Sequence, residues 1–130
     1  MSVREKALKN YTEKKYNCCQ AVICAYCEEV GIDDKEIFKL AESFGGGMGG
    51  MQDTCGAVTG AFMAIGIHRE ATRTKAETYS MVSELAKEFK TINGSIYCRD
   101  LKAIVDGQQR VSCARCVEVG AELVDKHMGK

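Results

Sequence analysis

The apolar positions of this chain recur at helical spacing along almost its whole length. In most stretches apolar side chains stand three or four residues apart, which is the period of one helix face. No stretch alternates apolar and polar residues convincingly in the manner of a half-buried strand. The pattern predicts helices over about 3–16, 18–30, 34–44, 55–65, 75–91, 96–105 and 113–127.

A capping residue stands before each expected helix and supports these boundaries. Asn17 and Thr74 each have a glutamine or glutamate three residues later, which is the spacing of a capping box. Asp33 repeats that spacing with Glu36. The other expected N-caps are Ser2, Thr54, Ser95 and Ser112. We therefore expect a single all-α domain over residues 1–130, a compact bundle of six or seven helices with no significant sheet.

The glycine-rich stretch at 45–50, GGGMGG, predicts a loop, because glycine disfavours helix and permits positive φ. Gly45, Gly47 and Gly50 have the spacing G-x-G-x-x-G, but a helix rather than a strand precedes them, so the context of a dinucleotide-binding site is missing. No Gly-Lys-Ser/Thr follows, so a P-loop is not supported either. Two interpretations stay open: a plain long loop, or a loop that brings backbone N–H groups close to the sulfur of Cys55.

Composition narrows the classes of function. The chain has 130 residues, with 18 basic and 18 acidic side chains and a formal net charge of zero, which argues against a nucleic-acid-binding protein or a polybasic membrane protein. No apolar run approaches the roughly 20 residues needed to span a bilayer. The first residues lack the apolar centre of a secretory signal. We therefore expect no membrane association and a cytoplasmic location.

Cysteine is abundant, with eight residues, while proline is absent. Four cysteines from distant segments fall in the first turns of four expected helices: Cys18, Cys55 and Cys113 directly follow an expected N-cap, and Cys98 lies three residues after Ser95. Unpaired N–H groups and the positive end of the helix dipole favour a thiolate there. The thiolate attacks disulfides and binds metals. The competing interpretation is that caps in an all-helical protein place residues in first turns by chance.

The other four cysteines differ in setting. Cys19 adjoins Cys18, but neighbouring side chains diverge on a helix, so packing in the core is expected. Cys24 and Cys27 have CxxC spacing but would lie inside the second helix, where the motif is expected to be incidental. Cys116 forms a second CxxC motif with Cys113, at the start of the last expected helix. A local disulfide between them is an alternative. No βαβ pattern surrounds the motif, so a thioredoxin fold is not supported.

Small residues form a stripe on the expected fourth helix. Gly56 and Gly60 are four residues apart, with alanines at 57, 61 and 64. Such a stripe allows another helix to approach closely, and we expect it to bring a second cysteine-bearing helix near Cys55. The competing use is the interface of a homodimer.

Several of these segments together are similar to a known family. The motifs are Asn17-Cys18, FGGGMGG, Cys55-Gly56-Ala57-Val58-Thr59-Gly60, Cys98-Arg99 and Cys113. Over about 16–124 the chain resembles the C-GCAxxG-C-C family of putative redox-active proteins, although the order here is Cys-Gly-Ala where the family label has Gly-Cys-Ala. The resemblance implies a small helical redox protein whose four family cysteines are Cys18, Cys55, Cys98 and Cys113. Cys19, Cys24, Cys27 and Cys116 are then additions of this chain.

Three hypotheses for the function follow. The first is thiol–disulfide chemistry, with Cys55 the most activated thiolate, Cys18 its partner, and Cys98 and Cys113 a second pair or relay. A redox partner protein or a small thiol would exchange electrons with them. The second is a zinc or iron–sulfur site whose ligands are Cys18, Cys55, Cys98 and Cys113. The third is a structural or partner-binding bundle with inert thiols. We expect Gly47, Gly49 and Gly56 to border the sulfur site and any cofactor it holds.

Overall fold

The protein folds as a helical bundle with one small hairpin. The computed structural model describes residues 1–68 and 73–128. Its elements are α1 (Val3–Thr12), α2 (Cys18–Cys24), α3 (Cys27–Val30), α4 (Asp34–Glu42), α5 (Gly45–Met48), α6 (Gly56–Ile67), α7 (Lys75–Asn93), α8 (Cys98–Leu101), β1 (Ile104–Val105), β2 (Gln108–Gln109) and α9 (Cys113–His127). Six of the helices in the described part of the chain are longer than one turn, which confirms the predicted all-α bundle. Within the same residues no helix is long and apolar enough to cross a membrane.

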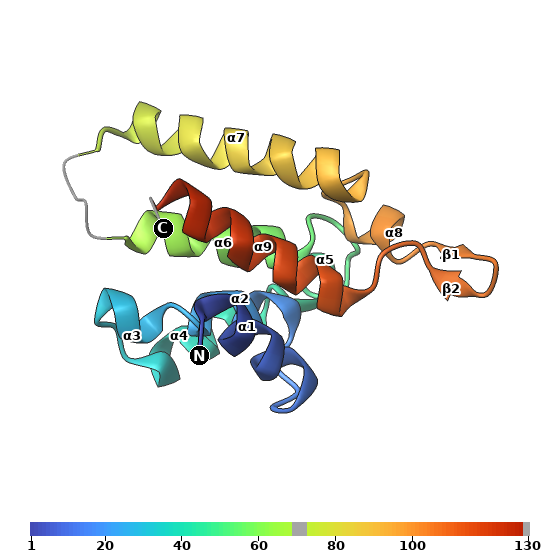
Figure 1. The fold of residues 1–130 in the computed structure, drawn as a ribbon, viewed down its shortest axis with the longest axis horizontal. Helices are drawn as coiled ribbons and strands as arrows, with labels where there is room; N and C mark the ends of the chain where they lie inside the picture. The colour runs from blue at the N-terminus through green and yellow to red at the C-terminus, as the bar shows by residue number, and fades with distance from the viewer. Residues whose placement is uncertain (69–72, 129–130) are drawn as a thin grey trace.

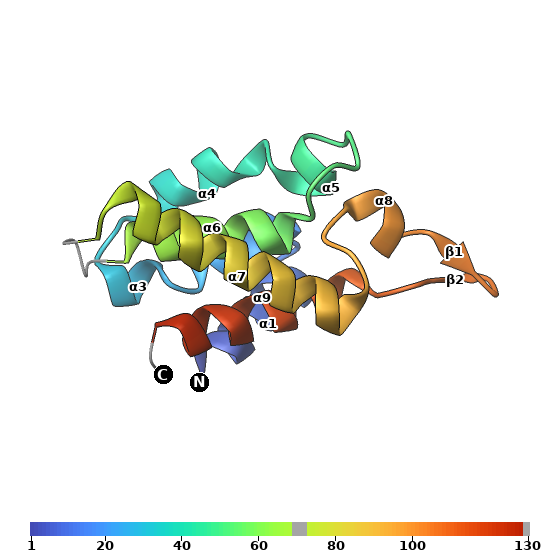
Figure 2. The same ribbon diagram turned by 90° about the horizontal axis from the view of Figure 1, so that it is seen from above.

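The helices stack in tiers. Figure 1 shows α7 along one side, α6 and α9 in the middle, and α1 to α4 on the opposite side. The view from above agrees, with α7 crossing over α6 and α9 (Figure 2). The short helices α5 and α8 and the β1–β2 hairpin gather at one end of the bundle. Five of the cysteines meet at that end: Cys18, Cys55, Cys98, Cys113 and Cys116.

Most predicted N-caps are confirmed. The Ser2, Asn17 and Thr74 side chains each accept a hydrogen bond from the backbone N–H three residues later, and each is part of a full capping box. Ser112 caps α9 in the same way through the N–H of Arg115. These caps depend on residues within one turn, which is why the sequence pattern locates them well.

The second predicted helix is interrupted, contrary to the prediction. α2 ends at Cys24, two turn residues follow, and α3 begins at Cys27. The buried Tyr26 explains the break, because its hydroxyl donates to the carbonyl of Ala121, 2.7 Å away, and lies 2.9 Å from Oδ1 of Asp125 on α9. The CxxC motif therefore spans a helix junction and is not inside a helix.

Several other local predictions are only partly right. Asp33 caps α4 through the N–H of Lys35, without the predicted box. The glycine stretch contains the single turn α5, but Gly46 and Gly47 within it have the positive φ expected of a glycine loop. Thr54 does not cap α6; it pairs with Tyr97 in an isolated bridge, and Cys55 is itself the N-cap residue.

The predicted helix at 96–105 is also shorter than expected. It is reduced to α8, followed by the antiparallel hairpin β1–β2. Ser95 still organises this turn, since its hydroxyl donates to Asp100 and accepts from the N–H of Tyr97. The two short strands are exposed and add no layer to the fold.

The small-residue stripe packs inside the chain. A Cβ at Gly60 would lie 2.8 Å from the carbonyl oxygen of Cys19, so α6 and α2 are in backbone contact there. A Cβ at Gly120 would lie 2.9 Å from the carbonyl oxygen of Ala57, so α9 is equally close to α6 on another side. The expectation of a close helix contact is confirmed. The alternative use of this stripe as a dimer interface is wrong, because its residues are buried within one chain.

Two alanine substitutions on α6 are expected to have opposite effects on stability. Gly60→Ala forces a methyl group against backbone and should lower the free energy of unfolding by about 1–3 kcal/mol. Gly66→Ala is the matched control on the same helix, because it is exposed and a Cβ there meets nothing within 4 Å. It should raise the free energy of unfolding by up to about 1 kcal/mol. Urea unfolding followed by circular dichroism measures both, and a neutral Gly60→Ala would contradict the close contact.

Candidate functional site

Five cysteines surround one small cavity at the end of the bundle. The cavity measures about 10 Å³, which is room for about one water molecule. Its walls are Cys18, Gly46, Gly47, Cys55, Gly56, Cys98, Leu101, Lys102, Val111, Cys113 and Cys116. The four cysteines selected from the sequence thus line the same space, and Cys116 lines it with them.

Backbone pairing places Cys55 beside Cys98. The N–H of Cys55 donates to the carbonyl of Ile96, and the N–H of Cys98 donates to the carbonyl of Asp53, both at 2.7 Å. The segment at 52–55 therefore lies against the segment at 96–99 as a short ladder. This pairing joins the start of α6 to the start of α8, although the two cysteines are 43 positions apart in sequence.

The start of α2 lies directly against the start of α6, because Gly56 has no side chain to separate them. A Cβ at Gly56 would lie 2.9 Å from the N atom of Cys19 and 3.1 Å from Cβ of Cys18. Asn17, the cap of α2, donates from its amide to the carbonyl of Glu42 at 3.0 Å and lies against Gly45. These contacts place Cys18 beside the N-terminal turn that carries Cys55.

Two of the three glycines expected to border the sulfur site, Gly47 and Gly56, line the cavity. Gly47 lines the cavity, and a Cβ there would lie 2.6 Å from Cβ of Cys98 and 2.7 Å from the N atom of Asp53. Gly56 lines it as well. Gly49 is absent from its walls and ends α5 with a left-handed conformation, whereas Gly46 is present.

Cys18 and Cys113 form a pair of sulfurs that shift each other's pKa. The hydrogen bond with Cys18 is the main cause that lowers the pKa of Cys113 to about 5; burial opposes it, while the Tyr11 hydroxyl and the charge of Lys102 add to it. The same hydrogen bond raises the pKa of Cys18, and burial raises it further. The pair is therefore arranged as a thiolate at Cys113 that accepts from the thiol of Cys18.

Cys55 and Cys116 form a second pair. The hydrogen bond with Cys116 lowers the pKa of Cys55 against the effect of burial, and the backbone N–H groups of Ala57 and Val58 lower it further. The pKa of Cys116 is raised, first by that hydrogen bond and then by burial. The N–H groups are those left free at the start of α6, as expected for a cysteine at a helix N-terminus.

The two pairs differ in access to solvent. Cys18 and Cys113 are half-buried, whereas Cys55 and Cys116 are only 5% and 2% exposed. We call Cys18–Cys113 the outer pair and Cys55–Cys116 the inner pair. Cys98, at 3% exposure, lies beside Lys102, and burial raises its pKa.

Sequence reasoning selected the four family cysteines but did not select their hydrogen-bonding partners. It assigned the strongest activation to Cys55, while the larger lowering of pKa is at Cys113. It considered Cys116 only as an alternative disulfide partner of Cys113, and it missed Tyr11 and Lys102. The signal for Cys116 was its i, i+3 spacing from Cys113, which puts both sulfurs on one face of a helix. Nothing local marks Tyr11, which comes from α1.

The remaining cysteines lie outside the cluster. Cys19 is fully buried, its sulfur is 3.8 Å from that of Met63, and burial raises its pKa to about 11. This agrees with the expected role in core packing. Cys24 and Cys27 line a separate groove.

The structure also bears on the metal hypothesis. Among residues 1–68 and 73–128, no group of three or more His, Cys, Asp or Glu side chains is arranged so that it could hold a metal ion. Four of the sulfurs instead shift each other's pKa in two pairs, Cys18 with Cys113 and Cys55 with Cys116. The polar side chains that line the cavity are five thiols and one lysine. They are arranged so that sulfurs pair with sulfurs.

Comparison with known proteins places this cluster in a family. No curated protein and no solved structure matches the chain. A family model described as "Putative redox-active protein (C_GCAxxG_C_C)" matches residues 16–127, which include every cysteine of the cavity. The chain therefore belongs to the C_GCAxxG_C_C family of putative redox-active proteins.

Proposed function

We propose that the protein carries out thiol–disulfide exchange, with Cys113 as the attacking thiolate and Cys18 as the resolving thiol. The supporting observation is that Cys113 combines partial exposure with the only pKa lowered to about 5 among the described cysteines. A thiolate at neutral pH is the form that attacks disulfides. Cys18 lines the same cavity and is the main cause of the lowered pKa of Cys113, so the second sulfur needs no long movement.

The exchange takes two steps. The Cys113 thiolate attacks one sulfur of a partner disulfide, forms a mixed disulfide and releases the other partner sulfur as a thiolate. Cys18 then attacks the sulfur of Cys113, forms the Cys18–Cys113 disulfide and releases the second partner sulfur, which takes the proton of Cys18. The partner disulfide gains two electrons, and the outer pair is oxidised by two electrons.

The inner pair gives the site a second dithiol. The charge of Cys55 raises the pKa of Cys18, and the charge of Cys113 raises the pKa of Cys55, so Cys55 is close to both sulfurs of the outer pair. A Cys55 thiolate can attack the outer disulfide, and Cys116 can resolve the product, which returns Cys18 and Cys113 to their reduced forms. The cavity has room for about one water, so a partner reaches the inner pair only through the outer pair.

Disulfide mapping tests this proposal. Anaerobically reduced protein is mixed with one equivalent of a disulfide oxidant, and free thiols are alkylated at increasing times before mass spectrometry. Trypsin cleaves after Arg115 and so separates Cys113 from Cys116. We expect Cys18–Cys113 to form first and Cys55–Cys116 to follow.

Other outcomes would contradict the proposal in different ways. Thiols that stay unmodified until the protein is denatured would support a bundle with inert cysteines. Zinc or iron at about one equivalent or more in the anaerobically purified protein, lost when Cys18 or Cys98 is replaced by serine, would support the tetracysteine metal site instead.

A further inference from the structure

The Cys24-Ala25-Tyr26-Cys27 motif spans a helix break and does not line the sulfur cavity. The N–H groups of Ala25 and Tyr26 bond to carbonyls three residues back, at 3.2 and 3.0 Å, so the chain turns tightly here. Cys24 lies within both of these turns, three residues before Cys27 at the start of α3, and a disulfide between them requires Cα atoms about 4.4–6.8 Å apart. Tyr26 anchors the turn on α9 through its hydroxyl. Each of the two sulfurs shifts the pKa of the other.

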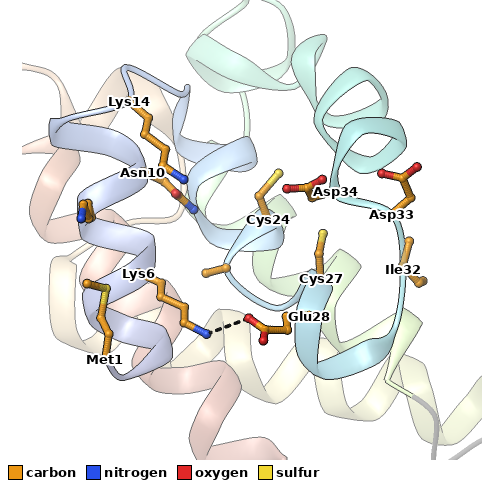
Figure 3. A pocket seen from close by; sticks show the side chains of 12 residues that line it. Met1, Lys6, Asn10, Lys14, Cys24, Cys27, Glu28, Ile32, Asp33 and Asp34 are labelled. Atoms are coloured by element: carbon orange, nitrogen blue, oxygen red, sulfur yellow. Dashed lines mark hydrogen bonds and ion pairs between the residues drawn. The ribbon is translucent and has the colours of Figure 1, made fainter.

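The two cysteines line an open groove between α1 and the α3–α4 region. The groove measures about 510 Å³, which is within the usual range of small-molecule sites. Figure 3 shows the sulfurs of Cys24 and Cys27 directed to the same side, with Asp34 next to Cys24. No residue that lines this groove also lines the sulfur cavity.

The groove presents both signs of charge. Lys6, Lys9 and Lys14 lie on the wall formed by α1 and the residues after it. Glu28, Asp33 and Asp34 lie on the opposite wall (Figure 3), and only Lys6 and Glu28 are within ion-pair distance across it, at 3.4 Å. A ligand that carries both ammonium and carboxylate groups would find partners on both walls.

We propose that Cys24 and Cys27 form a second, independent dithiol that is oxidised by a small zwitterionic disulfide, such as an amino-acid disulfide, bound in this groove. Carboxylates of the ligand face Lys9 and Lys14, and its ammonium groups face Asp33 and Asp34. The disulfide bond of the ligand then reaches Cys24, which is half-buried, before Cys27, which is 3% exposed.

The reaction is balanced within the groove. In its deprotonated form Cys24 attacks the ligand disulfide, forms a mixed disulfide and releases one ligand sulfur as a thiolate, which takes the proton that Cys24 lost. Cys27 attacks the sulfur of Cys24, closes the Cys24–Cys27 disulfide and releases the second ligand thiol. The dithiol loses two electrons and two protons, and the two released thiols carry both.

The two sulfurs of the groove have pKa values shifted in opposite directions. The hydrogen bond to Cys27 raises the pKa of Cys24, and burial and the charge of Asp34 raise it further. The hydrogen bond from Cys24 lowers the pKa of Cys27, while Asp34 and Asp33 oppose this.

Titration of the full-length reduced protein with cystine tests the proposal. Wild type should close a Cys24–Cys27 disulfide, which fragmentation of the peptide 16–35 locates by mass. Cys27→Ser lacks the resolving sulfur and should accumulate half-cystine on Cys24. Cys24→Ser should react at least about tenfold more slowly at this site, because the remaining sulfur is buried. Cys19→Ser is the matched control from the same helix and should behave as wild type.

The charge requirement is tested separately with Asp34→Asn. The ratio of the rate with cystine to the rate with uncharged hydroxyethyl disulfide should fall about threefold to fivefold, the size of one partly exposed charge pair. An unchanged ratio would overturn the zwitterionic ligand. A double variant, Cys24→Ser with Cys27→Ser, that consumes as much cystine as wild type would overturn the site itself. The cavity cysteines are intact in all these variants, so either failure is distinct from failure of the outer pair.

Discussion

Cys113→Ser is expected to abolish the Cys18–Cys113 disulfide and to slow attack on a disulfide about tenfold at pH 6. An ordinary thiol with a pKa of about 8.5 is on the order of 0.3% thiolate at that pH, whereas a thiol with a pKa of about 5 is mostly thiolate. That gain of roughly 300-fold is offset by lower nucleophilicity, by roughly 25- to 55-fold for a Brønsted coefficient of about 0.4–0.5. The net effect is that Cys113 attacks about ten times faster at pH 6 than an ordinary thiol would. Cys18, which remains in the variant, cannot supply this gain.

The pH profile is the sharper form of this prediction. Because the pKa of Cys113 is lowered, its alkylation rate should stay level from about pH 9 down to about pH 6 and fall by half near its pKa of about 5. An ordinary thiol loses reactivity from about pH 8.5 downward. The measurement is the iodoacetamide rate at Cys113 by mass spectrometry. A rate that already falls tenfold between pH 8 and pH 7 would contradict the thiolate assignment.

Two further variants separate the causes of the shift. Lys102→Met removes a positive charge near Cys113, so the pKa of Cys113 should rise and the profile should move to higher pH. Tyr11→Phe removes a hydrogen bond and should act in the same direction. Cys19→Ser serves as the control, because Cys19 is buried against Met63 and should leave the profile unchanged.

The sequence located those site residues that depend on local signals. Asn17 and Ser112 are strong caps, so the positions of Cys18 and Cys113 in the first turns of α2 and α9 followed from neighbours within one turn. Cys98 was selected through Ser95, which does organise its turn, although Tyr97 is the N-cap residue of α8. In each case the relevant hydrogen bonds join residues a few positions apart.

The partners of the sulfurs depend on contacts between distant segments. Cys55 is next to Cys116 because Gly120 lets α9 approach α6, and no local pattern encodes that register. The break between Cys24 and Cys27 depends on the hydrogen bond from Tyr26 to Ala121, 95 positions away. Helical spacing alone therefore predicted one continuous helix there, and tertiary contact decided otherwise.

Gly47→Ala is expected to be the most disruptive single substitution at the sulfur cavity outside the cysteines. Gly47 has a φ of 70°, which costs a residue with a Cβ roughly 1–2 kcal/mol. The added methyl would lie 2.6 Å from Cβ of Cys98 and 2.7 Å from a backbone nitrogen, and such overpacking costs about 1–3 kcal/mol more. The free energy of unfolding should fall by about 2–5 kcal/mol.

Gly46→Ala is the matched control, because it separates backbone strain from contact with Cys98. Gly46 has a φ of 65°, but a Cβ there meets nothing within 4 Å, so its cost should be limited to roughly 1–2 kcal/mol. Urea unfolding of both variants, followed by circular dichroism, gives the difference. The methyl of Gly47→Ala also pushes against the ladder that holds Cys98 beside Cys55, so Cys98 should be alkylated faster in folded Gly47→Ala than in Gly46→Ala. Equal losses of stability and equal alkylation of Cys98 would show that the glycine turn does not hold the sulfurs in place.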